Sequence, residues 1–528
     1  MKLTGFLFAA ALLGTCTQPA AEENYTRHVD PKIGTGGHGH VFVGANVPFG
    51  LVQVGPTSIP QTWDWCSGYH ASDSTVIGFS HTHLSGTGIG DLFDVTVMPV
   101  TGEVTYARGT EDDPTSGLWS YADRTQEIAR PGYYSVPLTR YGIRAELTAT
   151  ARVGLHRYTF PASDAAAVVF DLENGGCWDK ATETHLAKEG DRTVTGWRHS
   201  TGWAKDQRVY FVAEFSKPFE KFETIGDNYA RASFRTTDGE QVSLKVALSP
   251  VSVEGAKANL AAELSGWDFD ATAKAADKAW NDELSKVKIT TADETARRIF
   301  YTALYHTMIA PSLFCDVNGD YYGSDHAIHR NADFTNYTTF SLWDTYRAAM
   351  PLMTVLHPER MPDIIQTMLH ISDEQGRLPV WHLWGNETDC MVGNPGIVAV
   401  ADAIVKGIGG FDREKAFETI RKTAMNPDRG NGLRMEYGYI PCEMFNEAVA
   451  YDMEYALADG AAARAAETLG KAEDAKYFEE RSHSYRNYFD PATRFMRGRD
   501  SKKGWRTPFN AFASTHRADD YCEGNAWQ

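Results

Sequence analysis

The chain has 528 residues, of which 42% are hydrophobic, 23% charged and 12% aromatic, the balance of a soluble globular protein. Its length predicts roughly two to four domains. Its net charge of −18 argues against nucleic acid as a partner, because no basic patch is present to displace counterions.

The first residues have the pattern of a secretion signal. Lys2 precedes the apolar run Phe6–Leu13, which is too short to span a membrane as a helix. Cys16 follows this run in a segment that resembles a bacterial lipoprotein box, with an imperfect Thr15. Residues 1–24 are therefore predicted to be a signal peptide and lipoprotein tether with Cys16 lipidated; plain secretion is the alternative.

The remaining cysteines are scattered and form no CxxC pair, which argues against a zinc ribbon or a redox motif. They are Cys66, Cys177, Cys315, Cys390, Cys442 and Cys522. An exported protein of this size can contain a few disulfides, but the spacing does not indicate which cysteines pair.

Residues 25–253 read as a β domain. Short β-rich runs such as Ala165–Leu172, Arg208–Phe215 and Gln241–Leu248 are bounded by Gly-, Asn- and Asp-containing turns. This spacing predicts a large antiparallel sandwich. Residues 254–290 are rich in Ala, Lys and Asp and predict a helical linker.

From residue 291 the hydrophobic period is helical. Thr291 and Glu294 can form a capping box. One apolar stripe follows at helical spacing: Ala296, Ile299, Phe300, Ala303 and Leu304. Further helices are expected at Met361–Ile371, Arg413–Met425, Asn446–Leu457 and Ala472–Tyr488. Long loops between them predict an (α/α)6 toroid over 291–528 with a pocket at one end, so the fold class is α+β with several domains.

Two His-x-His pairs stand in Gly-rich segments and are the first candidate site. The residues are His38, His40, His81 and His83. They could bind zinc, since imidazole is a common zinc ligand. Hydrogen bonding to backbone or sugar hydroxyls is the favoured interpretation. Asp316–Asp320 reads as a tight turn, because its glycine is misplaced for a calcium loop and no bidentate glutamate follows.

Carboxylates in aromatic loops are the second candidate site. They are Asp344, Glu387, Glu443 and Glu523. A partly buried carboxylate beside aromatic rings can have a raised pKa, and glycosidic cleavage needs two such groups. Glu523 is the best candidate for a catalytic acid. It is the sixth residue from the end of the sequence, inside what reads as a site and not a frayed terminus.

The ordered motifs resemble glycoside hydrolase family 92, the calcium-dependent exo-α-mannosidases common in gut-type Bacteroidetes. They include DPKIGTGGHGH, SGYH, IGFSHTHLSGTG, FSLWDTYRA, GNETDCMVG, GYIP and YCEGNAWQ, and the match runs from about residue 27 to 528. The resemblance implies an N-terminal β-sandwich joined by helices to an (α/α)6 barrel.

The resemblance also implies roles for particular residues. Glu523, in EGNAWQ, matches the general acid. Gln528 is expected near the calcium ion, which grips mannose O2 and O3. The base is an aspartate in a Gly-Asn-Asp-Asp-x-Gly segment, which is not found in these 528 residues, so the toroid is expected to be truncated. The predicted substrate contacts are Trp65, His81, His83, Asp344 and Glu387.

The expected function is removal of terminal α-linked mannose from N-glycan-type oligosaccharides with inversion at the anomeric carbon. Mannose-containing glycans are the expected partners. The protein is expected to associate with the membrane only through a lipid anchor. We expect the protein at the outer membrane, cell surface or periplasm of a Gram-negative bacterium.

The alternatives to this function are a non-catalytic glycan-binding lipoprotein, an inactive fragment, or a zinc hydrolase built on the four histidines. An open toroid would expose apolar helix faces and lower solubility.

Overall fold

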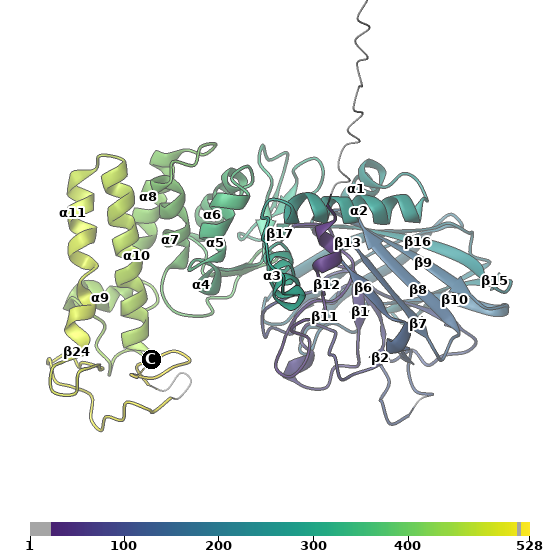
Figure 1. Cartoon of the computed structure of the whole chain (residues 1–528), viewed down its shortest axis with the longest axis horizontal. Helices are drawn as coiled ribbons and strands as arrows, with labels where there is room; N and C mark the ends of the chain where they lie inside the picture. The colour runs from purple at the N-terminus through teal and green to yellow at the C-terminus, as the bar shows by residue number, and fades with distance from the viewer. Residues whose placement is uncertain (1–22, 114, 515–518, 528) are drawn as a thin grey trace, which may run out of the picture.

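The structure is a computed structural model that describes residues 23–113, 115–514 and 519–527. The predicted lipidation site Cys16 and the predicted calcium-site residue Gln528 lie outside these ranges. The described chain has an N-terminal antiparallel β-sandwich followed by a helical domain, as predicted (Figure 1).

Two antiparallel sheets form the sandwich. The smaller sheet has six strands in the order β1 (Gly55–Thr57), β3 (Gly78–Ser80), β4 (Thr96–Thr101), β10 (Ser163–Asp171), β15 (Tyr229–Thr236), β14 (Lys221–Ile225). The larger has eight, in the order β11 (Lys180–Glu189), β12 (Thr193–Thr201), β13 (Gln207–Phe215), β16 (Glu240–Ser249), β9 (Val153–Phe160), β8 (Ile143–Ala149), β7 (Tyr133–Leu138), β6 (Ile128–Arg130). The three runs predicted as strands correspond to β10, β13 and β16.

The sheets meet through large, fully buried side chains. Phe170 of β10 stacks on Phe211 of β13 with ring centroids 6.1 Å apart, and both side chains are fully buried. Burial of this kind stabilises the fold by about 1.5–3 kcal/mol per large side chain. Contacts of this kind across the two sheets form the core of the sandwich.

The predicted linker consists of two helices, α1 (Val253–Glu263) and α2 (Phe269–Leu284), each started by a side-chain cap. Trp280 of α2 is fully buried, and its Nε1 donates to the carbonyl oxygen of Asn46 at 2.8 Å. Its ring lies 4.4 Å from that of Tyr305 in the first helix of the helical domain. This tryptophan therefore joins the N-terminal segment to the helical domain.

The helical domain extends away from the sandwich as a row of packed helices (Figure 1). Its helices are α3 (Glu294–His306), α4 (Leu342–Thr345), α5 (Ala349–Leu356), α6 (Met361–Gln375), α7 (Pro395–Val405), α8 (Arg413–Ala424), α9 (Asn431–Tyr437), α10 (Ala448–Thr468) and α11 (Ala472–Arg481). Buried alanines of α10, including Ala462 and Ala466, let it pack closely on its neighbours. The helix predicted over Ala472–Tyr488 breaks after Arg481, and η4 (Ser484–Tyr488) follows as a 3-10 turn.

Short elements connect these layers. The remaining strands are β2 (Thr75–Val76), β5 (Ser120–Tyr121), β17 (Ser312–Leu313), β18 (Tyr321–Tyr322), β19 (Ile328–His329), β20 (Tyr337–Thr338), β21 (Phe340–Ser341), β22 (Trp381–Leu383), β23 (Asn386–Glu387), β24 (Phe489–Asp490) and β25 (Phe495–Met496). The other 3-10 turns are η1 (Tyr25–His28), η2 (Trp63–Trp65) and η3 (Arg124–Gln126). Across the described ranges, no helix combines the length and apolar character needed to cross a bilayer.

The start and the buried face of α3 differ from the prediction. Its cap is Asp293, which accepts from the amides of Thr295 and Ala296, and not Thr291. Of the predicted stripe only Leu304 is buried; Ile299 is 55% exposed. The reason is that Tyr301 and Tyr305 pack on η1 and α2, so the helix turns its apolar stripe away from them.

This orientation predicts unequal effects of two similar truncations on one helix. Leu304→Ala should lower the free energy of unfolding by about 2–4 kcal/mol, because the Leu304 side chain is only 7% exposed and its removal leaves a cavity. Ile299→Ala should change it by no more than about 0.5 kcal/mol. Urea unfolding measures both, and equal losses would contradict the orientation of α3.

Candidate active site

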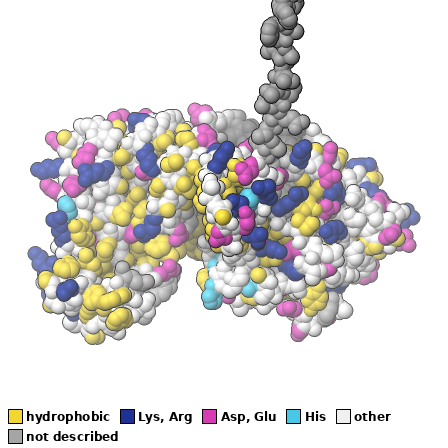
Figure 2. Space-filling model, viewed as in Figure 1, with side chains coloured by type: hydrophobic (Ala, Val, Ile, Leu, Met, Phe, Trp, Pro, Cys, Tyr) yellow, Lys and Arg dark blue, Asp and Glu magenta, His cyan; other side chains and the backbone are white. Residues whose placement is uncertain are grey.

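A cavity of about 660 Å³ lies where the sandwich meets the loops of the helical domain. Its lining includes Trp203, Asp389, Glu443, Glu447, Cys522 and Glu523. Figure 2 shows the surface hollowed between the two parts of the molecule, on the side of the C-terminal loops. The cavity thus combines one sandwich tryptophan with several carboxylates of the helical domain.

Glu523 lies exposed in this cavity on backbone with a φ of 49°. The preceding residues are anchored to the start of α10: the amide of Glu447 donates to the carbonyl of Asp519 at 2.7 Å, and that of Ala450 to Asp520 at 3.1 Å. Arg506 Nε also donates to the Asp520 carboxylate at 2.6 Å. Left-handed backbone is costly for a glutamate and is found preferentially at functional sites.

Glu447 is a second carboxylate of the cavity, and the sequence reasoning missed it. It is 9% exposed and caps α10 with a φ of 55°. Its Oε1 is buried with no hydrogen-bond partner in the part of the chain that the structure describes. Burial, followed by the charge of Glu447, raises the pKa of the neighbouring Cys522 thiol to about 12. In the sequence, the one signal for Glu447 is its position just before an Ala-rich helix.

Glu443 stands on the loop that the GYIP motif begins. It accepts a hydrogen bond from the amide of Ser501 at 2.9 Å. Burial raises its pKa, but the hydrogen bonds from Ser501 outweigh this, so the pKa lies below the usual glutamate value. Glu443 is thus held as a carboxylate, which does not suit a group that must donate a proton.

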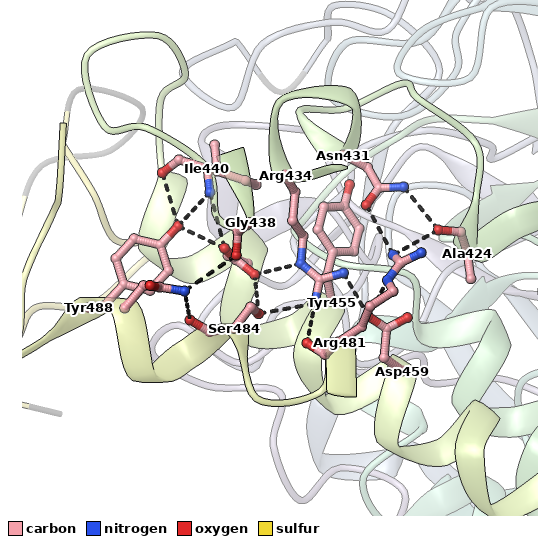
Figure 3. Close-up of polar contacts among 12 residues, drawn as sticks. Ala424, Asn431, Arg434, Gly438, Ile440, Tyr455, Asp459, Arg481, Ser484 and Tyr488 are labelled. Carbon is pink, nitrogen blue, oxygen red and sulfur yellow. Dashed lines mark hydrogen bonds and ion pairs between the residues drawn. The ribbon is translucent and has the colours of Figure 1, made fainter. Parts of the chain in front are cut away.

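A buried polar network fixes the loop that carries Glu443 (Figure 3). Arg434 donates to Asp452 at 2.6 Å and to Asp459 at 2.6 Å, and all three side chains are at most 3% exposed. Asp452 also accepts from the amide of Ile440 at 3.1 Å and from the Tyr488 hydroxyl at 2.9 Å. The network therefore ties the first residue of the loop to α9, α10 and η4.

Trp203 is positioned from inside the sandwich. The fully buried Asp91 accepts from the amide of Trp203 at 2.9 Å and from that of Ala204 at 2.8 Å. Burial raises the pKa of Asp91. The Trp203 ring meets Trp381 of β22 edge to face at 4.7 Å. This pair stands at the boundary between sandwich and helices.

Trp381 also lines a second cavity of about 200 Å³, and the predicted contact Asp344 lies in it. Residues 85–87 of the SHTHLSGTG motif line the same cavity. Asp344 is exposed and accepts from the Ser341 hydroxyl at 2.6 Å. The structure thus brings the sandwich motif and the WDTYR motif together, in a cavity beside that of Glu523.

The carboxylate of Glu387 is instead hydrogen-bonded to nearby backbone amides. Its carboxylate accepts from the amides of Val380 at 2.8 Å, Trp381 at 2.9 Å and Asp389 at 3.0 Å. These bonds shape the turn that places Asp389 on the cavity wall. A direct substrate contact of Glu387 stays a prediction.

The predicted sandwich contacts lie at different depths. Trp65 is partly exposed; its Nε1 donates to Asp73 at 2.7 Å and its ring stacks on His70. His81 is fully buried between the Val95 carbonyl, at 2.6 Å, and His156 Nε2, at 2.9 Å.

His83 is 3% exposed, and its Nδ1 donates to the Gln53 carbonyl at 2.7 Å. His38 and His40 instead approach Asp64, at 2.9 Å and 3.5 Å. In the described ranges these four histidines do not form one metal-ligand group, so the geometry does not support the zinc alternative. Substrate contacts of Trp65, His81 and His83 stay predictions.

The buried histidines predict loss of stability in acid. Burial lowers the pKa of His83 to about 4, below the usual value near 6.5 of the unfolded chain. Unfolding therefore takes up a proton when the pH lies between these values. The contribution of His83 to the free energy of unfolding is complete above about pH 6.5, and it decreases by up to about 1.4 kcal/mol for each pH unit as the pH is lowered. His83→Gln should flatten this slope in urea unfolding.

His38→Gln is the matched control, since the His38 side chain is 84% exposed. It should change the slope far less than His83→Gln does. A slope that His83→Gln does not alter would contradict the burial effect.

Comparisons with known proteins identify the family. The model of the glycosyl hydrolase family 92 N-terminal domain matches residues 28–249, and that of the family's catalytic domain matches residues 255–528. The chain belongs to glycosyl hydrolase family 92.

Solved structures of family 92 agree with this assignment. An α-mannosidase from Bacteroides thetaiotaomicron, in complex with mannoimidazole, is 39% identical with a TM-score of 0.92, covering 96% of this chain and 70% of that one. An inverting mannosidase from the same organism is 28% identical with a TM-score of 0.86, covering 97% and 71%. The sandwich and helical domain are thus the family's arrangement.

A curated relative, described as an uncharacterized secreted glycosidase of Arthroderma benhamiae, is 25% identical over 538 residues. The match covers 91% of this chain and 64% of the relative. The chain therefore spans less than two thirds of that relative's length.

Proposed function

We propose that this family 92 protein is an exo-α-mannosidase that removes terminal α-linked mannose from N-glycan-type oligosaccharides with inversion, and that Glu523 is its general acid. The observation that carries the proposal is the position of Glu523, on left-handed backbone in the cavity between sandwich and helices. The family match and the mannosidase structures support the reaction class.

In the proposed mechanism the Glu523 carboxyl protonates the glycosidic oxygen as the bond to the anomeric carbon breaks. Trp203 supplies an apolar ring for the sugar and excludes water from one side of the cavity. No carboxylate of the described chain is assigned the base, because the family motif that holds it is not among these residues. Glu443, held by Ser501, orients its loop.

Calcium is part of the proposal, and one buried carboxylate oxygen of the cavity supports it. Glu447 Oε1 is a buried carboxylate oxygen with no hydrogen-bond partner in the described ranges, and oxygen is the ligand that calcium prefers. Glu447 would help to hold the ion, with Gln528 as the second proposed ligand. Bound there, calcium would bind vicinal hydroxyls of the mannose.

We further propose that the protein is exported and lipid-anchored through Cys16 in a Gram-negative bacterium. The signal pattern of residues 1–24 supports export, as does the secreted relative.

A panel of α-1,2-, α-1,3-, α-1,4- and α-1,6-mannobioses, incubated with enzyme and calcium and followed by NMR, tests the activity. The first product formed should be β-mannose, and chelation of calcium should abolish turnover. Initial release of α-mannose would overturn inversion. Calorimetric binding of mannose without turnover would favour the glycan-binding alternative.

A further inference from the structure

A hairpin between the sandwich and the helical domain gathers three metal-binding side chains. Strands β18 and β19 bring Asp325 and His329 against Glu374 of α6. His329 Nε2 lies 3.1 Å from Asp325 Oδ1 and 3.6 Å from Glu374 Oε1, and the three ligand atoms lie within 4.8 Å of one another. None of them belongs to the cavity of Glu523.

The basic partner that the ion pairs of this group show is its own histidine, His329. The Glu374 side chain is 5% exposed, and its oxygens accept from the Tyr321 hydroxyl at 2.8 Å and the Ser324 amide at 2.7 Å. Among the ion pairs of the described ranges, none joins a lysine or arginine to Asp325, His329 or Glu374. A carboxylate this deeply buried is stabilised further by a nearby cation.

A second group in the same chain shows what a filled site of this composition looks like. Glu283, His357 and Glu359 also lie within metal-ligand distance of one another. There the ammonium of Lys286 occupies the centre, at 2.7 Å from Glu283, 3.1 Å from His357 and 3.2 Å from Glu359. Lysine thus supplies a permanent cation in one group, whereas the ion pairs of the hairpin group, among the described residues, involve only a histidine.

Glycine at position 323 lets two of the proposed ligand atoms come close to the hairpin backbone. A Cβ on Gly323 would lie 2.7 Å from both Asp325 Oδ1 and His329 Nε2, so a larger residue there would clash with the two proposed ligand atoms. The His329 ring is held by stacking on Tyr321 at 4.8 Å and 10°. Zinc binds nitrogen and oxygen at about 2.0–2.2 Å, which places tetrahedral ligand atoms about 3.3–3.6 Å apart. The separation of His329 Nε2 from Glu374 Oε1, 3.6 Å, lies at the upper end of this range. That of His329 Nε2 from Asp325 Oδ1, 3.1 Å, lies just below it and is a hydrogen bond in this structure.

We propose that Asp325, His329 and Glu374 form a structural zinc site, with a fourth position open to water. The same hairpin contacts the sandwich through Asp206, which accepts from the Tyr322 hydroxyl at 2.8 Å and lies 3.0 Å from His326 Nδ1. Zinc at Glu374 fastens the other side of the hairpin to α6. The ion therefore stabilises the junction of the two domains.

Calorimetry with zinc chloride on the chelator-treated protein tests the site. Wild type should bind one equivalent of zinc that His329→Ala, Asp325→Asn and Gly323→Ala each lose or bind at least about tenfold more weakly. Zinc should raise the thermal midpoint of wild type but not of these variants. Because Asp325 and His329 are about one-third exposed, their variants should fold.

Glu359→Gln is the matched control, since it alters the group that Lys286 already fills. It should leave zinc stoichiometry and the midpoint shift unchanged. Equal zinc binding in wild type and His329→Ala would overturn the proposal, as would binding of calcium but not zinc at this group. Neither result bears on mannosidase activity, so the two proposals fail separately.

Discussion

Glu523→Gln is expected to lower kcat for a mannobiose by about 10²–10⁴-fold, because the leaving sugar would depart without a proton. An activated aryl mannoside needs no such proton, so the same variant should lose far less activity on it. Hydrolysis rates of both substrates, measured at saturating calcium, give the ratio that identifies a general acid.

Glu443→Gln and Glu447→Gln are the controls, because both side chains line the same cavity. Glu443→Gln should show no dependence on the leaving group. Glu447→Gln should instead weaken calcium binding and affect both substrates alike. A leaving-group dependence at Glu447 that is absent at Glu523 would reassign the acid.

Asp452→Ala is expected to lower the free energy of unfolding by about 3–5 kcal/mol, because it leaves the guanidinium of Arg434 buried with one partner fewer. The Arg434 and Asp452 side chains are 3% and 0% exposed. The same substitution removes one of the two acceptors of the Ile440 amide, which begins the loop of Glu443, so activity should fall at temperatures where the variant is still folded. Urea unfolding and hydrolysis assays measure the two effects.

Glu467→Ala, which breaks the exposed Arg464–Glu467 pair, is the comparison on the same helix. It should cost no more than about 0.5 kcal/mol, since solvent screens such pairs. A loss below 1 kcal/mol for Asp452→Ala would show that the network in Figure 3 does not hold the domain together.

Elements whose signal is local were predictable. Strands β10, β13 and β16 combine β-branched and aromatic residues with turn residues at both ends, and they form within two residues of the predicted bounds. The helical linker and the helices at 361 and 413 carry their own caps or periods. The ordered motifs then pointed to family 92, which the comparisons confirm.

Features that depend on packing against distant residues were not predictable in this way. The stripe of α3 has perfect helical spacing, but Tyr301 and Tyr305 decide the buried face by packing on η1 and α2. Glu387 stands in a motif, yet three backbone amides occupy its carboxylate. Glu447 belongs to no motif, and it lines the cavity only because residues 519–523 fold back onto the start of α10.

By itself the sequence determined the fold class, the order of the domains, the family and the candidacy of Glu523, because periodicity and motifs are local properties of the chain. Only the tertiary structure decided which side chains share a cavity with Glu523, which histidines are buried, and which acidic groups have a cation. Those depend on long-range packing, where residues such as Glu374 and His329 meet across 45 positions of sequence.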